Sequence, residues 1–164
     1  LTRKIYNHSD VMDNFSCCAW VSVSKQYRTR EILERVIKEV SRPSREEFLM
    51  IDRMTLEELE EKVFELLKER RYLVVLDDIW SREAWETLKN ALPNTRNGSR
   101  TMLTTRNKDV ALYPDLQTHL HELRCLSEEE SWELFSRRVF PGSNTSSCHS
   151  NLEKLGRAMV ERCG

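Results

Sequence analysis

The sequence feature that most constrains the fold is an unbroken apolar run that ends on two adjacent acids. Residues 71–80 read RYLVVLDDIW, so the apolar residues 72–76 are followed directly by Asp77 and Asp78. An apolar run without polar alternation is typical of a strand that is covered on both faces, as in a parallel sheet. We therefore expect residues 72–76 to form an interior strand that carries both carboxylates at its carboxyl end.

Segments with strand character alternate with segments of helical periodicity along the chain. Residues 17–23 and 100–105 have the composition of strands, and residues 119–123 are a candidate fourth strand. Residues 41–48 read as a loop. We expect helices from Thr29 through Val40, after a Thr55–Glu58 capping box, at 80–91 and near 108–112. This alternation predicts an α/β fold with a doubly wound parallel sheet.

The character of the chain changes after residue 125. Ser127 and Glu130 form a capping box for a helix that extends through Phe140, and a last amphipathic helix begins at Ser150. We therefore divide the chain into an α/β domain at 1–125 and the start of a helical subdomain at 126–164.

Composition limits the classes of function. The net charge of −1 and the pI of about 6.5 give no reason to expect binding to nucleic acid or to anionic membranes. No apolar run has the length of a transmembrane segment. The five cysteines show no C-x-x-C spacing, and their odd number leaves one unpaired. Reduced thiols in the cytoplasm fit this pattern best.

Ligands of doubly wound sheets bind beyond the carboxyl ends of the strands, where this sequence carries acids and an arginine. A carboxylate such as Asp77 can hold Mg²⁺, and a neighbouring acid such as Asp78 can orient or deprotonate an attacking water. Thr104, Thr105 and Arg106 end the third strand, and a guanidinium matches a phosphate group. The alternatives are that the acids cap the next helix and that the arginine forms a salt bridge at the rim of the sheet.

Four segments that occur in order carry a resemblance to a known family. They are FSCCAWVSVSKQY at 15–27, YLVVLDDIW at 72–80, GSRTMLTTRNKDVAL at 98–112 and LHELRCLSEEESWELFSRRVF at 120–140. Together they resemble the NB-ARC domain of plant NLR disease-resistance proteins, a branch of the STAND ATPases. Trp80 at the end of LDDIW resembles the coiled-coil class of these receptors.

The resemblance implies a P-loop NTPase-like fold and a nucleotide switch. Family members hold ADP at rest, exchange it for ATP on activation, and oligomerise. By similarity, Asp77 would be the acid of the Mg²⁺ site and Asp78 the catalytic acid that positions water. Arg106, with Thr105 beside it, would bind the nucleotide. Residues 126–164 would begin the helical ARC1 subdomain, with coiled-coil and leucine-rich repeat domains as partners in the full-length receptor.

The sequence also departs from the family pattern. The family's phosphate-binding loop and first strand are expected before Leu1, and its GLPL motif is expected at about Gly164. We therefore expect this chain to be an internal segment of a longer protein. Nucleotide binding and any slow ATPase activity would then require the complete domain.

Two other classes of function compete with the switch. One is a phosphoryl-transfer enzyme of another α/β class that uses Asp77 and Asp78. A phosphoacceptor receiver would need an acid where this chain has Ser22, Val23 and Ser24, and a haloacid-type phosphatase would need D-x-D. The other is an interaction scaffold that does not hydrolyse nucleotide, which only measurements on a complete domain can distinguish from a switch.

Overall fold

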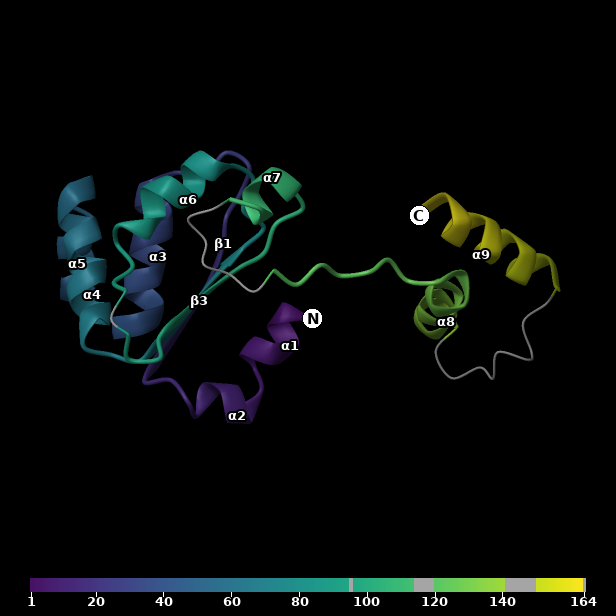
Figure 1. Cartoon of the computed structure of the whole chain (residues 1–164), viewed down its shortest axis with the longest axis horizontal. Helices are drawn as coiled ribbons and strands as arrows, with labels where there is room; N and C mark the ends of the chain where they lie inside the picture. The colour runs from purple at the N-terminus through teal and green to yellow at the C-terminus, as the bar shows by residue number, and fades with distance from the viewer. Residues whose placement is uncertain (95, 114–119, 141–149, 164) are drawn as a thin grey trace. The chain divides into compact units, whose positions relative to one another are not determined.

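The computed structural model describes residues 1–94, 96–113, 120–140 and 150–163. The chain divides into two compact units, residues 1–118 and residues 119–164 (Figure 1). In chain order the elements of the first unit are α1 (Thr2–Tyr6), α2 (Ser9–Met12), β1 (Cys17–Ser22), α3 (Thr29–Ser41), α4 (Arg45–Ile51), α5 (Leu56–Lys68), β2 (Tyr72–Asp77), α6 (Arg82–Lys89), β3 (Arg100–Leu103) and α7 (Lys108–Ala111). The elements of the second unit are α8 (Glu128–Val139) and α9 (Ser150–Cys163).

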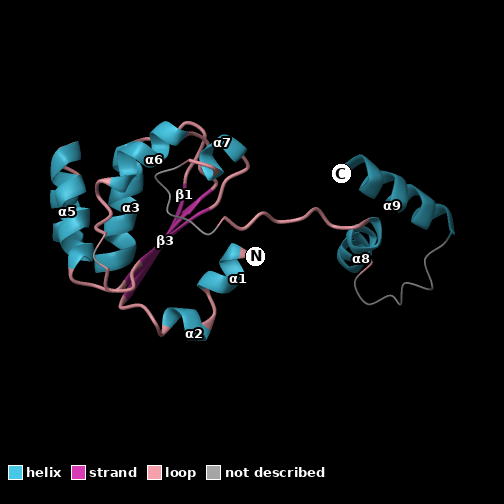
Figure 2. Cartoon of the chain, in the orientation of Figure 1, coloured by secondary structure: helices cyan, strands magenta, loops and turns pink. Residues whose placement is uncertain are grey.

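The three strands form a parallel sheet in the order β1-β2-β3, drawn in magenta in Figure 2. In the register of the sheet, Ala19 lies opposite Val74, and Val75 lies opposite Met102. The prediction that residues 72–76 form an interior strand flanked by the other two is confirmed. The predicted α/β class with a parallel sheet is confirmed as well.

Strand β2 is buried on both faces, as its unbroken apolar sequence predicts. None of residues 72–76 is more than 4% exposed. Because side chains alternate along a strand, Tyr72, Val74 and Leu76 point to one face and Leu73 and Val75 to the other. The first set joins the main hydrophobic core. Strand β2 is therefore fixed in position, and so is the acid pair at its end.

Helix α3 supplies the largest share of the core from any helix. It packs against β1, α5 and α6, which lie around it in Figure 1. Its buried residues recur at helical spacing, which puts them on one face: Ile32, Leu33, Val36, Ile37 and Val40. Helix α5 begins at the predicted capping box of Thr55 and Glu58, and it buries Leu59, Val63 and Leu67.

The other face of β1 contacts the first helix of the chain. Trp20 points away from the buried Ala19 and Val21, and its ring meets that of Tyr6 edge to face at a centroid distance of 5.3 Å. Burial, with smaller contributions from Cys18 and Glu39, raises the pKa of Tyr6 to about 12. The Tyr6 hydroxyl therefore stays neutral at physiological pH.

Two expectations about secondary structure were wrong. Residues 41–48 were expected to be a loop, but α4 begins at Arg45 with a capping box in which Ser44 and Glu47 satisfy each other's backbone N–H groups. Residues 120–123 form no strand, and residue 119 lies outside the described residues. The described residues of the second unit include no strand with which this weakly alternating segment could pair.

The second unit is held together by aromatic packing between α8 and α9. Trp132 and Phe135 on α8 stack at a centroid distance of 5.8 Å, and the guanidinium of Arg157 lies 4.6 Å from the Trp132 ring. A Cβ atom at Gly156 would lie 2.8 Å from Trp132 Cζ3 and 2.9 Å from Phe135 Cε1. The glycine therefore lets α9 approach the two rings closely.

None of the helices in the described residues is long and apolar enough to cross a membrane. Cys17, Cys18, Cys125 and Cys163 are free thiols, and Cys148 lies outside the described residues. Burial raises the pKa of both Cys17 and Cys18, so these thiols are poor nucleophiles.

Candidate functional site

The candidate site lies where β2 and β3 end. The backbone N–H of Thr104 donates to the carbonyl of Leu76 at 3.0 Å, and the N–H of Ile79 donates to the carbonyl of Thr104 at 2.8 Å. These two bonds continue the pairing of the strands past their formal ends. The segment after β3 is thereby held beside Asp77 and Asp78, as the sequence predicts.

The hydroxyl of Thr104 connects the two acids. It donates to Oδ1 of Asp77 at 2.6 Å, and it accepts the backbone N–H of Asp78 at 2.8 Å. The backbone carbonyl of Asp77 accepts the N–H of Val23 at 2.8 Å, which ties the same residue to β1. Asp77 is therefore fixed by bonds from the residues that directly follow both neighbouring strands. Residue type and position along the chain do not predict this role of Thr104.

The chain turns sharply at Asp78, which has a φ of 62°. This left-handed conformation is unfavourable for most residues with a side chain, and Asp and Asn tolerate it best after glycine. Because of this turn, the two carboxylates point in different directions. Asp77 faces Thr104, whereas Asp78 faces Arg106.

Arg106 forms an ion pair with Asp78. Its Nε lies 3.3 Å from Oδ1 and its Nη2 lies 3.5 Å from Oδ2, so both carboxylate oxygens face the guanidinium. The Arg106 side chain is 81% exposed and that of Asp78 is 34% exposed. An ion pair this open to water contributes only about 0–1 kcal/mol, so a stronger anion can displace the carboxylate. The structure therefore shows the salt bridge at the rim of the sheet, which was the alternative to a phosphate contact of Arg106.

Thr105 lies in the same loop, and its hydroxyl makes bonds within that loop. It donates to the carbonyl of Ile79 at 2.7 Å and accepts the backbone N–H of Asn107 at 3.0 Å. The side chain of Asn107 donates to the carbonyl of Trp80 at 3.4 Å. Thr105 therefore fixes the loop that carries Arg106, and its hydroxyl is already engaged.

The ring of Trp80 adds an aromatic surface to the site. The guanidinium of Arg106 lies 5.7 Å from the ring centroid, and the ammonium of Lys25, which follows β1, lies 5.8 Å from it. In the sequence, Trp80 is only a family marker, and Lys25 was not predicted to lie at the site. The signal that could have identified them is position, because both follow strands that end at the same edge of the sheet.

The polar groups of the site fit a hard cation better than a soft one. Asp77 and Asp78 supply carboxylates and Thr104 supplies a hydroxyl, which are the oxygen ligands that Mg²⁺ prefers. The described residues contain no group of three or more His, Cys, Asp or Glu side chains arranged around a metal. Mg²⁺ usually takes one or two carboxylates and completes its shell with water and phosphate.

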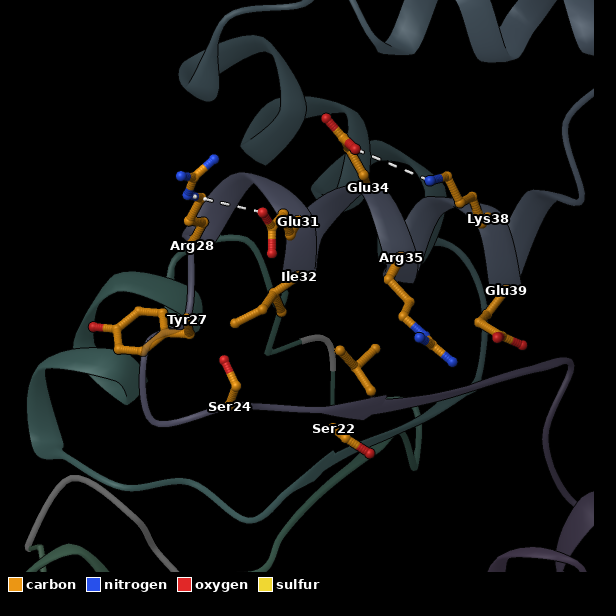
Figure 3. A pocket seen from close by; sticks show the side chains of 11 residues that line it. Ser22, Ser24, Tyr27, Arg28, Glu31, Ile32, Glu34, Arg35, Lys38 and Glu39 are labelled. Atoms are coloured by element: carbon orange, nitrogen blue, oxygen red, sulfur yellow. Dashed lines mark ion pairs between the residues drawn. The ribbon is translucent and has the colours of Figure 1, made fainter.

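A cavity of about 410 Å³ lies elsewhere, between the end of β1 and the face of α3 (Figure 3). Its lining includes three cations and three acids, and it contains neither of the adjacent aspartates nor Arg106. The charged residues of its lining are Arg28, Arg35, Lys38, Glu31, Glu34 and Glu39. The cavity is therefore separate from the candidate site at the ends of β2 and β3.

Comparisons with known proteins identify the family of the chain. The chain is 46% identical to the disease resistance protein RPP13 of Arabidopsis thaliana over 99% of its own length and 19% of that protein. It is 42% identical to the putative disease resistance RPP13-like protein 3 of that plant (100% and 19%) and 37% identical to its disease resistance protein RPM1 (99% and 18%). The chain thus spans about one fifth of the length of these relatives. The NB-ARC domain family matches residues 1–145, and the chain belongs to that family.

Proposed function

We propose that this chain is the ADP/ATP switch segment of a cytoplasmic plant immune receptor. The observation that carries the proposal is the arrangement at the ends of β2 and β3, where Thr104 joins the two acids and Arg106 pairs with Asp78. Membership of the NB-ARC family and the names of the relatives support the receptor role.

In this proposal each acid has its own task. Asp77 holds Mg²⁺, because its carboxylate is fixed by Thr104 beside a second acid. Bound Mg²⁺ neutralises charge on the nucleotide phosphates. Asp78 orients or deprotonates a water molecule, and it can do so only when Arg106 leaves its carboxylate.

Arg106 distinguishes the two nucleotides in this proposal. With ADP, which has no γ-phosphate, the arginine stays on Asp78. With ATP it moves to the γ-phosphate, which carries more negative charge than a carboxylate. Exchange of partners would then release Asp78 at the moment that ATP is bound. Thr105 contributes to nucleotide binding by fixing the loop that carries the arginine.

The rest of the proposal concerns the longer protein. Residues 1–125 belong to the nucleotide-binding domain and residues 126–164 begin the ARC1 subdomain. The other receptor domains, a coiled coil and leucine-rich repeats, are its partners, and the activated receptor oligomerises. Any ATPase activity is slow and belongs to the complete domain.

The test is the substitution Arg106→Ala in an NB-ARC domain that carries this chain together with a glycine-rich phosphate-binding loop. Affinities for MgATP and MgADP are measured by isothermal titration. We expect the preference for ATP over ADP to fall roughly 10- to 150-fold, the usual value of a charge-assisted hydrogen bond.

Arg100→Ala is the matched control for this test, because Arg100 is an exposed arginine at the opposite end of β3. It should leave the ratio of affinities unchanged. Equal ratios in the parent and in Arg106→Ala, with an unchanged circular dichroism spectrum, would count against the switch.

A further inference from the structure

Trp80 is an aromatic residue that lies outside the core of the first unit. Its side chain lies at the carboxyl edge of the sheet, and the residue is 37% exposed. Two cations lie over its ring, Arg106 from the segment after β3 and Lys25 from the segment after β1. The three side chains come together only because parallel strands end at one edge.

We propose that Trp80 is the positioning residue for Arg106. The guanidinium of Arg106 stays in contact with the Trp80 ring whether or not a γ-phosphate is bound, so the ring acts as a platform for it. That the anion is the γ-phosphate of ATP rests on the proposed function. The platform itself rests only on the contact between Trp80 and Arg106.

A guanidinium can make two kinds of contact at once. Its N–H donors point outward in its plane, whereas an aromatic ring attracts the cation through the ring's quadrupole. Contact with the ring therefore leaves the N–H groups free for an anion. In the structure, Nε and Nη2 of Arg106 face Asp78 while the same guanidinium lies 5.7 Å from the Trp80 centroid.

The two contacts differ in how easily they are exchanged. The pair with Asp78 is open to water and is therefore weak. The ring does not compete with phosphate for the N–H donors. Arg106 can therefore leave Asp78 for a phosphate without leaving Trp80, and the ring limits the rotamer freedom that a free arginine would lose on binding.

The backbone of Trp80 is held to the loop that carries Arg106. Asn107 donates to the Trp80 carbonyl, and Thr105 donates to the carbonyl of the preceding residue, Ile79. The side chains on either side of Arg106 therefore hold the backbone at Ile79 and Trp80 next to the segment that carries the arginine. This attachment keeps the ring within reach of the guanidinium.

The first experiment tests the platform without nucleotide. In the full 164-residue chain, the ring current of Trp80 should shift the Hε resonance of Arg106 upfield, and Arg106→Lys identifies that resonance. Trp80→Leu keeps apolar bulk without a ring and should abolish the shift, whereas Trp80→Phe should keep part of it. Lys25→Met is the matched control, because it removes the other cation on the ring and should leave the shift in place. The same Hε position in the parent and in Trp80→Leu overturns the proposal.

The second experiment measures nucleotide affinity in an NB-ARC domain that carries this chain and a glycine-rich phosphate-binding loop. Trp80→Leu should weaken MgATP binding about two- to fivefold, the range expected for a cation over an exposed ring, and should change MgADP binding little. In an Arg106→Ala background, Trp80→Leu should have no further effect. An equal loss in both backgrounds overturns positioning through Arg106. If Arg106→Ala leaves the ratio of ATP to ADP affinity unchanged, the proposed switch fails, and the resonance shift still decides the platform.

Discussion

At the scale of single residues, one hydroxyl organises the acid pair. Thr104 both donates and accepts in this arrangement, so it stabilises the carboxylate of Asp77 and satisfies the backbone of Asp78 at the same time. Valine has a similar shape but no hydroxyl, so it can neither donate to Asp77 nor accept the N–H of Asp78. The stability of this edge of the sheet should therefore depend on residue 104.

The substitution Thr104→Val tests this dependence. It keeps the shape of the side chain and leaves the Asp78 N–H without its acceptor, so we expect a loss of about 1–3 kcal/mol in the free energy of unfolding. Urea denaturation of the two proteins measures the difference. Thr104→Ser keeps the hydroxyl and should retain most of the stability; a midpoint for Thr104→Val equal to the parental one would show that the two bonds contribute nothing.

The two acids should respond differently to substitution in a complete domain. Asp77→Ala should weaken MgADP binding about 10- to 100-fold, the usual effect of removing a metal partner that acts through water. Asp78→Ala should affect binding less and should slow hydrolysis about 100-fold or more, as expected for loss of a general base. Titration calorimetry and phosphate release measure the two effects. Hydrolysis by Asp78→Ala at the parental rate would refute the role given to Asp78.

Part of this site could be predicted from the sequence, and part could not. The rule that parallel strands end at one edge was enough to bring Asp77, Asp78 and Arg106 together. The bridging role of Thr104 and the cations on Trp80 depend on backbone angles and rotamers, which residue type alone does not determine. The positions of these residues along the chain therefore predicted that the acids and the arginine lie close together. They did not predict which hydrogen bonds and ring contacts the side chains make.

At the scale of elements, capping boxes were the most reliable signals. Those of α5 and α8 were predicted and are confirmed. The same pattern at Ser44 and Glu47 begins α4, but the polar residues around Pro43 suggested a loop. Strand signals were reliable only where a run was apolar throughout, because a weak alternation such as residues 120–123 forms a strand only if another strand pairs with it.

The capping box of α8 gives a prediction about pH. Two hydrogen bonds from Arg124 to Glu130, both 2.6 Å long, and the capped Ser127 N–H lower the pKa of Glu130 to about 2. A carboxylate whose pKa is depressed in the folded state stabilises that state above its ordinary pKa of about 4.5. This contribution is lost as the pH falls from about 4.5 towards 2.

Denaturation at pH 6 and at pH 2.5 measures this loss, which should be small because the side chains are exposed. Glu130→Gln should show a smaller difference between the two pH values than the parent does. Glu161→Gln, a change of an exposed glutamate on α9, is the control. An identical difference in the parent and in Glu130→Gln would mean that this pair does not stabilise the fold.

At the scale of the whole molecule, the 164 residues carry the acids and the arginine but only four glycines and no glycine-rich loop. In P-loop proteins, phosphates are held chiefly by successive backbone N–H groups, a helix N-terminus and a lysine. Carboxylates without these groups repel phosphate unless a cation lies between them. Nucleotide affinity should therefore depend on a segment that supplies such a loop.

We expect the 164-residue chain alone to bind MgADP weakly. The same chain joined to a segment with a G-x-x-x-x-G-K-[ST] loop should bind much more tightly, and the same fusion with the loop lysine replaced by alanine is the control. Titration calorimetry measures the MgADP affinity of all three proteins. Micromolar affinity of the 164-residue chain by itself would show that the phosphates are held elsewhere.

The left-handed turn at Asp78 also determines how natural variants at this position should be interpreted. In a library of all substitutions, protein abundance should tolerate Asn and Gly, which suit a φ of 62°, and should fall for β-branched residues. If Asp78 has the role proposed for it, signalling by the proposed receptor should tolerate fewer substitutions than abundance does. A gene with Asn at this position would then encode a protein that accumulates normally and signals abnormally, and measurements of protein level alone would classify it as intact.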